Sequence, residues 1–140
     1  MQTIITDYAP RAADIRAIRE QVFLIEQRVP AEEEFDDRDL RCEHVVVYDG
    51  DRPLGTARVD WEKDGKVGRV AVLKSQRRRG VGTVLMQAIE QQAMARGAGR
   101  LWCNAQVSAI AFYQSLGYSV CSGEFEEAHI PHVAMEKELE

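Results

Sequence analysis

Apolar residues near the N-terminus recur at the spacing of an α-helix. The recurring positions are Ile15, Ile18, Val22 and Ile25. Intervals of three and four residues place all of them on one helix face. Pro10 suits the first turn of this helix, and Pro30 ends it. The pattern predicts an amphipathic helix that packs its apolar face on a sheet.

Runs of β-branched and alternating apolar residues predict the strands of that sheet. In chain order, the predicted strands are 3–6, 44–48, 54–61, 67–73, 101–105, 118–121 and 133–136. A helix from Val81 to about Arg96 connects the strands at 67–73 and 101–105, so these two run parallel. A short helix at 110–116 follows. We expect an α/β fold with a mixed, mostly antiparallel sheet and flanking helices, in a single domain spanning residues 1–140.

A turn with three arginines and two glycines lies just before the helix that begins at Val81. It reads Arg77-Arg78-Arg79-Gly80-Val81-Gly82. Glycines let several amide N–H groups converge on one anion, and the helix adds unpaired N–H groups and its positive dipole end. The absence of Gly-Lys-Ser/Thr and of a third glycine excludes a P-loop and a dinucleotide fingerprint. The turn predicts a phosphate site, with a plain tight turn and solvated arginines as the alternative.

Composition narrows the classes of protein that fit. Hydrophobic residues make up 45% of the chain and charged residues 29%, which is ordinary for a globular protein. The formal net charge of −5 argues against nucleic-acid binding, so the arginines of the turn suit a small polyanion better. No apolar run reaches the length of a membrane span, and the N-terminus has no signal-peptide pattern. We therefore expect a cytoplasmic protein with no membrane partner.

The cysteines predict neither disulfides nor a metal site. Cys42, Cys103 and Cys121 are odd in number and lack metal-ligand spacing. Reduced thiols, buried at Cys42 and Cys103, are the expectation in a cytosolic protein.

Six acids occupy the eight positions 32–39. In one interpretation this segment is a solvated loop. In the other, it borders an acceptor site and attracts a cationic amine by electrostatic focusing. The sequence leaves both interpretations open.

Two separate parts of the chain resemble the GNAT superfamily of N-acetyltransferases. The arginine-glycine turn is similar to that family's Arg/Gln-x-x-Gly-x-Gly/Ala loop, and residues 109–118, Ala-Ile-Ala-Phe-Tyr-Gln-Ser-Leu-Gly-Tyr, resemble its C-terminal motif. Segments at 26–30, 104–106 and 130–135, with His44, resemble small bacterial members, the ElaA- and YjcF-like proteins. The resemblance implies the GNAT fold, in which one parallel strand pair splays apart.

The same resemblance implies acetyl-CoA as acyl donor, held largely by main-chain groups, and no metal. Val70, Ala71 and Val72 would bind pantetheine, with the Val72 N–H on the acetyl oxygen. The residues whose amides would hold the pyrophosphate are Arg77, Arg78, Arg79, Gly80, Val81, Gly82 and Thr83. Asn104, on the neighbouring strand, would also reach the pantetheine.

Tyr113 matches the family's usual general acid, which protonates the leaving thiolate of CoA. The general base is less clear. Many GNAT enzymes carry a glutamate on the strand before the turn, but Gly68 stands at the corresponding position. His132 and Glu26 are the first candidates to replace it, since an unperturbed imidazole pKa of about 6.5 suits a base near neutral pH.

Further candidates for the base are Asp60, Glu62 and His44, each with a structural role as the alternative. His129 stands where close relatives often have glycine, so it either alters the acceptor mouth or has no role.

The leading hypothesis is transfer of an acetyl group to a primary amine, of a small molecule or a peptide, by direct attack in a ternary complex. A catalytically idle acyl-CoA-binding regulatory module on the same fold is the alternative. The protein could be a monomer or a homodimer.

Overall fold

The centre of the computed structural model is a twisted sheet of eight strands, and all 140 residues are described. The strands are β1 (Gln2–Thr6), β2 (Glu43–Asp49), β3 (Arg52–Asp60), β4 (Lys66–Val72), β5 (Arg100–Gln106), β6 (Ser119–Val120), β7 (Phe125–Glu127) and β8 (Ile130–Glu138). Their order in the sheet is β1-β2-β3-β4-β5-β8-β6, and β7 also pairs with β8. Only β4 and β5 run parallel, which confirms the predicted mixed, mostly antiparallel sheet.

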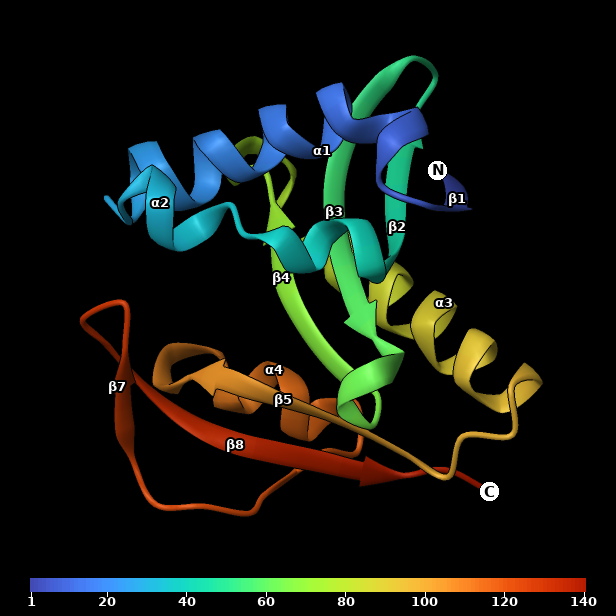
Figure 1. The fold of residues 1–140 in the computed structure, drawn as a ribbon, viewed down its shortest axis with the longest axis vertical. Coiled ribbons are helices and arrows are strands. Elements are labelled where there is room, and N and C mark those ends of the chain that lie inside the picture. The colour runs from blue at the N-terminus through green and yellow to red at the C-terminus, as the bar shows by residue number, and fades with distance from the viewer.

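Four α-helices flank the sheet. They are α1 (Ala12–Arg19), α2 (Ala31–Glu34), α3 (Val81–Ala95) and α4 (Ile110–Ser115). Short 3-10 helices lie at Ala9–Arg11, Asp37–Arg41, Trp61–Lys63, Lys74–Gln76 and Val107–Ala109. None of the helices has the length and apolarity that a membrane crossing would require. In Figure 1, β5 and β8 cross the view at a steep angle to β3 and β4, with α1 and α2 above them.

The sheet separates two apolar cores. In β2, Val45 and Val47 face a core of 18 buried residues built around α3, whereas Val46 and Tyr48 face a core of 8 built around α1. This alternation is the period of two expected of a strand buried on both faces. Each core therefore packs one layer of helices against one face of the sheet.

The first helix departs from the predicted apolar stripe in its second half. Ile15, Ile18 and Val22 are buried as expected, but Ile25 is 64% exposed. From Glu20 to Glu26 the helix is π-helical, and the Gln27 N–H donates to the Val22 carbonyl five residues back. Hydrogen bonding to the fifth residue brings position i+5 over position i, so Phe23 takes the buried place below Ile18. The helix also ends before Gln27, earlier than the predicted stop at Pro30.

A β-bulge in β4 shapes the site. Thr56 pairs with Ala71 and Arg58 with Gly68, so β4 carries one more residue than β3 between these pairs. Arg69 has φ +51° in this bulge. An extra residue reverses the alternation of side chains along a strand, and here Arg69 lies on the same face as Gly68.

Beyond the bulge, β4 and β5 separate. Their parallel pairing is limited to Lys66 with Trp102 and Val67 with Cys103, although β4 continues to Val72 and β5 to Gln106. The predicted splayed parallel pair is therefore confirmed. No strand was predicted between 118–121 and 133–136, but this segment contains β7, which pairs with β8.

Candidate active site

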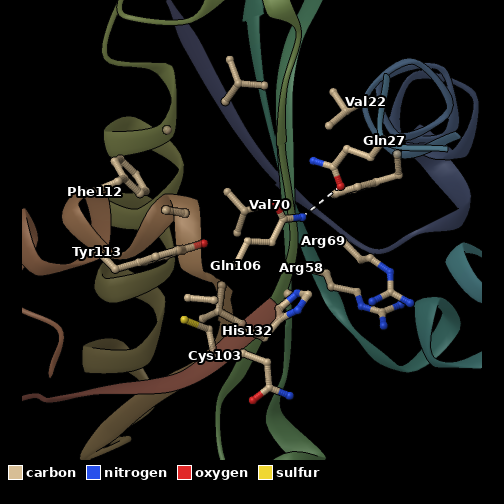
Figure 2. Close-up of a pocket in the computed structure, with 18 of the residues that line it drawn as sticks. Val22, Gln27, Arg58, Arg69, Val70, Cys103, Gln106, Phe112, Tyr113 and His132 are labelled. Atoms are coloured by element: carbon tan, nitrogen blue, oxygen red, sulfur yellow. Dashed lines mark hydrogen bonds between the residues drawn. The ribbon is translucent and has the colours of Figure 1, made fainter. Parts of the chain in front are cut away.

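An open cleft with a volume of about 1150 Å³ fills the gap between β4 and β5. The turn before α3 and the aromatic pair of α4 line one end. Arginines of β3 and β4 and residues of α2 line the other. Figure 2 shows Phe112 and Tyr113 on one side of β4, and Arg58 and Arg69 on the opposite side. The cleft thus has two differently built halves that meet in the gap.

The turn before α3 has the backbone conformation of an anion cradle. Arg78 and Gly80 have φ +64° and +82°. A Cβ atom at Gly82 would lie 3.0 Å from the Phe112 Cζ, so this glycine lets the turn approach α4 closely. The residues of the turn that line the cleft are Arg77, Arg78, Gly80, Val81, Gly82 and Thr83. Arg79 was also predicted to hold the pyrophosphate, but it does not line the cleft. Its Nη1 donates to Gln76 Oε1 at 2.6 Å.

The main chain of β4 presents unpaired groups to the gap. The Leu73 N–H donates to the Leu54 carbonyl of β3 at 3.0 Å. Because successive N–H groups alternate along a strand, the Val72 N–H points the other way, toward the gap. Val70 and Val72 line the cleft, whereas the side chain of Ala71 is buried in the core around α1. The Val72 carbonyl accepts from Arg77 Nε at 3.1 Å.

Tyr113 lies on α4 with its hydroxyl directed at the gap beside Val70 (Figure 2). The side chain is 6% exposed, and its hydroxyl makes no hydrogen bond within the protein. Its ring packs edge-on against Phe112 and Tyr118, at centroid distances of 5.1 and 5.8 Å. Burial raises the pKa of Tyr113 well above its ordinary value, and neighbouring Cys103 adds to this shift. The phenol therefore keeps its proton and is available as a donor.

His132 lines the cleft from β8, opposite Gln106 in the register. Its Nδ1 lies 2.7 Å from the Ile130 carbonyl, which can only accept, so in the neutral ring Nδ1 carries the proton. The lone pair is then on Nε2, 3.6 Å from Glu127 Oε2. A base with this tautomer is ready to take a proton from a group in the cleft.

Glu127 is a residue that sequence reasoning missed. It lies on β7, in a segment to which no strand was assigned, and it also accepts from Asn104 Nδ2 at 3.5 Å. Glu127 therefore lies beside both the predicted pantetheine-binding Asn104 and the candidate base His132.

Glu26 does not line the cleft. Its carboxylate accepts two hydrogen bonds from Arg77, which lower its pKa although burial opposes this shift. A carboxylate held ionised in this way has little tendency to take up a proton.

The other candidate bases are engaged in structural contacts. His44 is 1% exposed with Nε2 2.9 Å from the Asp39 carbonyl, and burial lowers its pKa. Asp60 accepts two hydrogen bonds from Arg38, and Glu62 pairs with Arg38 and Arg41. His129 is exposed and does not line the cleft.

The acidic segment is not the solvated loop that one interpretation expected. Glu34 and Asp39 are each 3% exposed, and Arg19, itself 1% exposed, contacts their carboxylates at 2.7 and 2.8 Å. Arg58 joins the network through Asp36 and Asp39, both at 2.8 Å. The segment does border the cleft, at Glu33, Glu34 and Asp36. Its two buried carboxylates are paired with arginines, whereas the other acids of the segment are exposed. Attraction of a cationic amine by this segment stays a prediction.

Comparison with known proteins gives a consistent picture. Residues 6–139 match the family model described as an acetyltransferase (GNAT) domain. The chain is 45% identical over 142 residues to the uncharacterized N-acetyltransferase YjcF of Bacillus subtilis, covering 99% of this chain and 100% of YjcF.

Solved structures agree. A crystal structure of a Lactobacillus plantarum protein superposes with a TM-score of 0.90 at 34% identity, covering 99% and 97% of the two chains. Escherichia coli ElaA superposes with a TM-score of 0.88, covering 98% and 99%; at 24% identity this likeness shows the fold alone. The predicted resemblance to ElaA- and YjcF-like proteins is confirmed.

Proposed function

The chain belongs to the GNAT family of acetyltransferases, and from that premise we propose that it transfers an acetyl group from acetyl-CoA to a primary amine. Attack takes place directly, with both substrates bound in the cleft at once. The observation that carries this proposal is the meeting of three groups in one gap: the Val72 N–H, the Tyr113 hydroxyl and the glycine turn before α3. Acetyl-CoA, when bound, supplies the activated acyl carbon.

The half of the cleft lined by the turn before α3, by Val70 and Val72 and by α4, called here the donor half, holds acetyl-CoA and polarises its thioester carbonyl. Amide groups of the turn and the first turn of α3 hold the diphosphate, as expected for a bare backbone cradle at the N-terminus of a 15-residue helix. The Val72 N–H and the main chain of Val70 face the pantetheine arm. The Val72 N–H stabilises negative charge that develops on the carbonyl oxygen during attack, and one such donor is worth roughly 10²–10³ in rate.

Two protons move in opposite directions. His132 Nε2 accepts a proton from the attacking amine, which is needed because an alkyl ammonium with a pKa near 10.4 is almost fully charged at neutral pH. The Tyr113 hydroxyl donates a proton to the departing thiolate. Tyr113 packs in the core around α3 with Val133, whereas the neighbouring His132 lies on the other face of the sheet, so neither occupies the place of the other.

A catalytically idle acyl-CoA-binding module on the same fold is the second candidate. One specific feature favours it: Gly68 stands where many family members carry a glutamate base. In the proposed transferase, His132 takes the place of this missing base.

The test is a screen of primary amines and peptides in which free thiol is measured during incubation with acetyl-CoA. Thiol release that depends on an acceptor supports the transferase and excludes the idle module. Titration calorimetry gives the independent control. An enzyme that binds CoA yet releases no thiol with any amine is the idle module, and a protein that does not bind CoA at millimolar concentration contradicts both candidates.

A further inference from the structure

Two cationic side chains flank a glycine in the half of the cleft that is lined by arginines of β3 and β4 and by α2, called here the acceptor half. Lys66, Gly68 and Arg69 all line it. Lys66 shares a face with Trp102, since its Nζ lies 5.4 Å from the centre of that ring. Strict alternation along β4 would send Arg69 to the opposite face, but the bulge turns it to the side of Lys66. The bulge therefore gathers both cations around one point of the strand.

Gly68 leaves open space at that point. Its φ lies outside the left-handed region, so the backbone does not require glycine there. A Cβ atom at Gly68 would meet no heavy atom within 4 Å. The missing side chain thus serves neither a turn nor a close contact, and its effect is room in the cleft between the two cations.

This half carries equal numbers of cationic and acidic side chains, but they do not all form ion pairs. The cations that line it are Arg38, Arg58, Lys63, Lys66 and Arg69, and the acids are Glu33, Glu34, Asp36, Asp60 and Glu127. Three of the acids are held by arginines: Glu34 by Arg19 and Arg69, Asp36 by Arg58 and Arg69, and Asp60 by Arg38.

Lys66, by contrast, is half-buried and forms no ion pair. Burial lowers the pKa of its ammonium group, and Glu127 opposes this shift without making contact. Arg69 keeps its Nη1 free of hydrogen bonds, because its contacts to α2 use Nε and Nη2. Two donors with positive charge are therefore available over Gly68.

We propose that the acceptor is an amine that also carries an anionic group, and that this anion binds over Gly68 between Lys66 and Arg69. The inference rests on the proposed function, since it describes the second substrate of the same cleft. The amine end of such a molecule reaches His132 and Glu127, whose carboxylate attracts an ammonium group. A zwitterion therefore meets a complementary charge at each end, whereas a polyamine meets a cation at Lys66.

The experiment measures binding to the protein saturated with CoA, so that no turnover is needed. Calorimetry compares matched pairs that differ only in the anionic group: L-lysine with cadaverine, 4-aminobutyrate with propylamine, and O-phosphoethanolamine with ethanolamine. We expect the anionic member of at least one pair to bind at least about tenfold more tightly. This factor corresponds to the lower end of the free-energy range for a hydrogen bond to a charged group. The third pair separates a phosphate from a carboxylate as the preferred anion.

Two variants assign the preference to this site. Lys66→Met and Gly68→Ala are each expected to abolish most of it, while Lys66→Arg retains it. Matched controls are Arg52→Met, which removes an exposed cation at a distant turn, and Gly123→Ala, which adds a methyl group to an exposed loop.

Equal or tighter binding of the partners without the anionic group in every pair, or binding by no member of any pair, overturns the inference. A preference that survives in both Lys66→Met and Gly68→Ala also overturns it. Thiol release from acetyl-CoA is recorded with the same pairs and judges the proposed function separately. An enzyme that acetylates cadaverine better than L-lysine keeps the proposed function and loses this inference.

Discussion

Arg77 donates hydrogen bonds to both carboxylate oxygens of Glu26, at 2.6 Å each, and so ties the end of the first helix to the turn before α3. This contact lowers the pKa of Glu26. We expect Glu26→Gln to leave kcat close to that of the unaltered enzyme, because a carboxylate held in this pair is a poor base. Steady-state kinetics with the best acceptor of the screen give the answer. A large loss of kcat in Glu26→Gln would instead identify Glu26 as the base.

His132→Gln is expected to lower kcat by roughly 10²–10⁴, the usual contribution of a general base. Steady-state kinetics with the best acceptor of the screen measure the loss. His129→Gln, an exposed histidine outside the cleft, serves as the control and should retain kcat. Equal kcat values in the two variants would remove His132 from the mechanism.

Tyr113→Phe should reduce kcat by about 10²-fold or more while CoA affinity stays the same, because only the proton donor is lost. Stability should change little, since the hydroxyl makes no hydrogen bond within the protein.

Tyr118→Phe is the matched control. Its hydroxyl is buried without a partner, so its removal should be neutral or slightly stabilising and leave kcat intact. Equal losses of activity in the two variants would mean that the aromatic cluster acts by packing alone.

Thr83→Glu tests the diphosphate cradle without disturbing the helix. Thr83 is the third residue of α3 and lines the cleft, and glutamate is favourable in the first turn of a helix. We expect unchanged thermal stability and a loss of CoA binding in calorimetry, because a carboxylate would face the diphosphate. Thr83→Gln, of equal size and without charge, should bind far better. Equal affinities of the two variants would show that the diphosphate lies elsewhere.

Arg19→Met should destabilise the protein by about 3–5 kcal/mol, because it leaves buried carboxylates without their cation. Arg19 is 1% exposed and contacts Glu34 and Asp39. Denaturant unfolding measures the loss. Arg16→Met, which removes an exposed ion pair to Glu20 on the same helix, should cost less than about 1 kcal/mol. Similar losses in both variants would contradict a structural role for the buried network.

Asp36 gives the network a predictable pH dependence. Burial favours the protonated form, but hydrogen bonds and charges of Arg58 and Arg69 win and lower the pKa of Asp36 to about 2. A lowered folded-state pKa stabilises the protein above the unfolded value of about 3.9, and that contribution disappears as pH falls toward 2.

Asp36→Asn should therefore be less stable than the unaltered protein at neutral pH, by about 1 kcal/mol after allowance for solvent screening, and equally stable near pH 2. Urea unfolding at a series of pH values records the difference. A difference that is independent of pH would mean that Asp36 contributes by shape and not by charge.

Local patterns predicted the parts of the fold that local forces determine. The helix expected from Val81 to about Arg96 is α3, Val81–Ala95, because its apolar period and the preceding glycine turn are strong signals. The sequence also indicated the splayed pair, through the family resemblance. Tyr113 and His132 both line the cleft, and their roles stay predictions.

What the sequence could not predict depends on contacts between distant residues. The π-helical turn exposes Ile25 and buries Phe23, and no local signal separates it from a continuous α-helix. Glu34 resembles any solvated acid until Arg19 and Arg69 are folded against it. The bulge at Arg69 places a non-glycine residue at positive φ, which sequence rules disfavour.

The separation of β4 from β5 has a consequence for how relatives of this protein diverge. The edge of β4 that faces the gap offers N–H and C=O groups, which every residue type except proline supplies in full. Under the proposed function, mutation can therefore exchange the side chains of this strand while its main-chain contacts to the acyl carrier remain. On the same proposals, drift at Lys66, Gly68 and Arg69 changes the choice of nucleophile without changing the carrier.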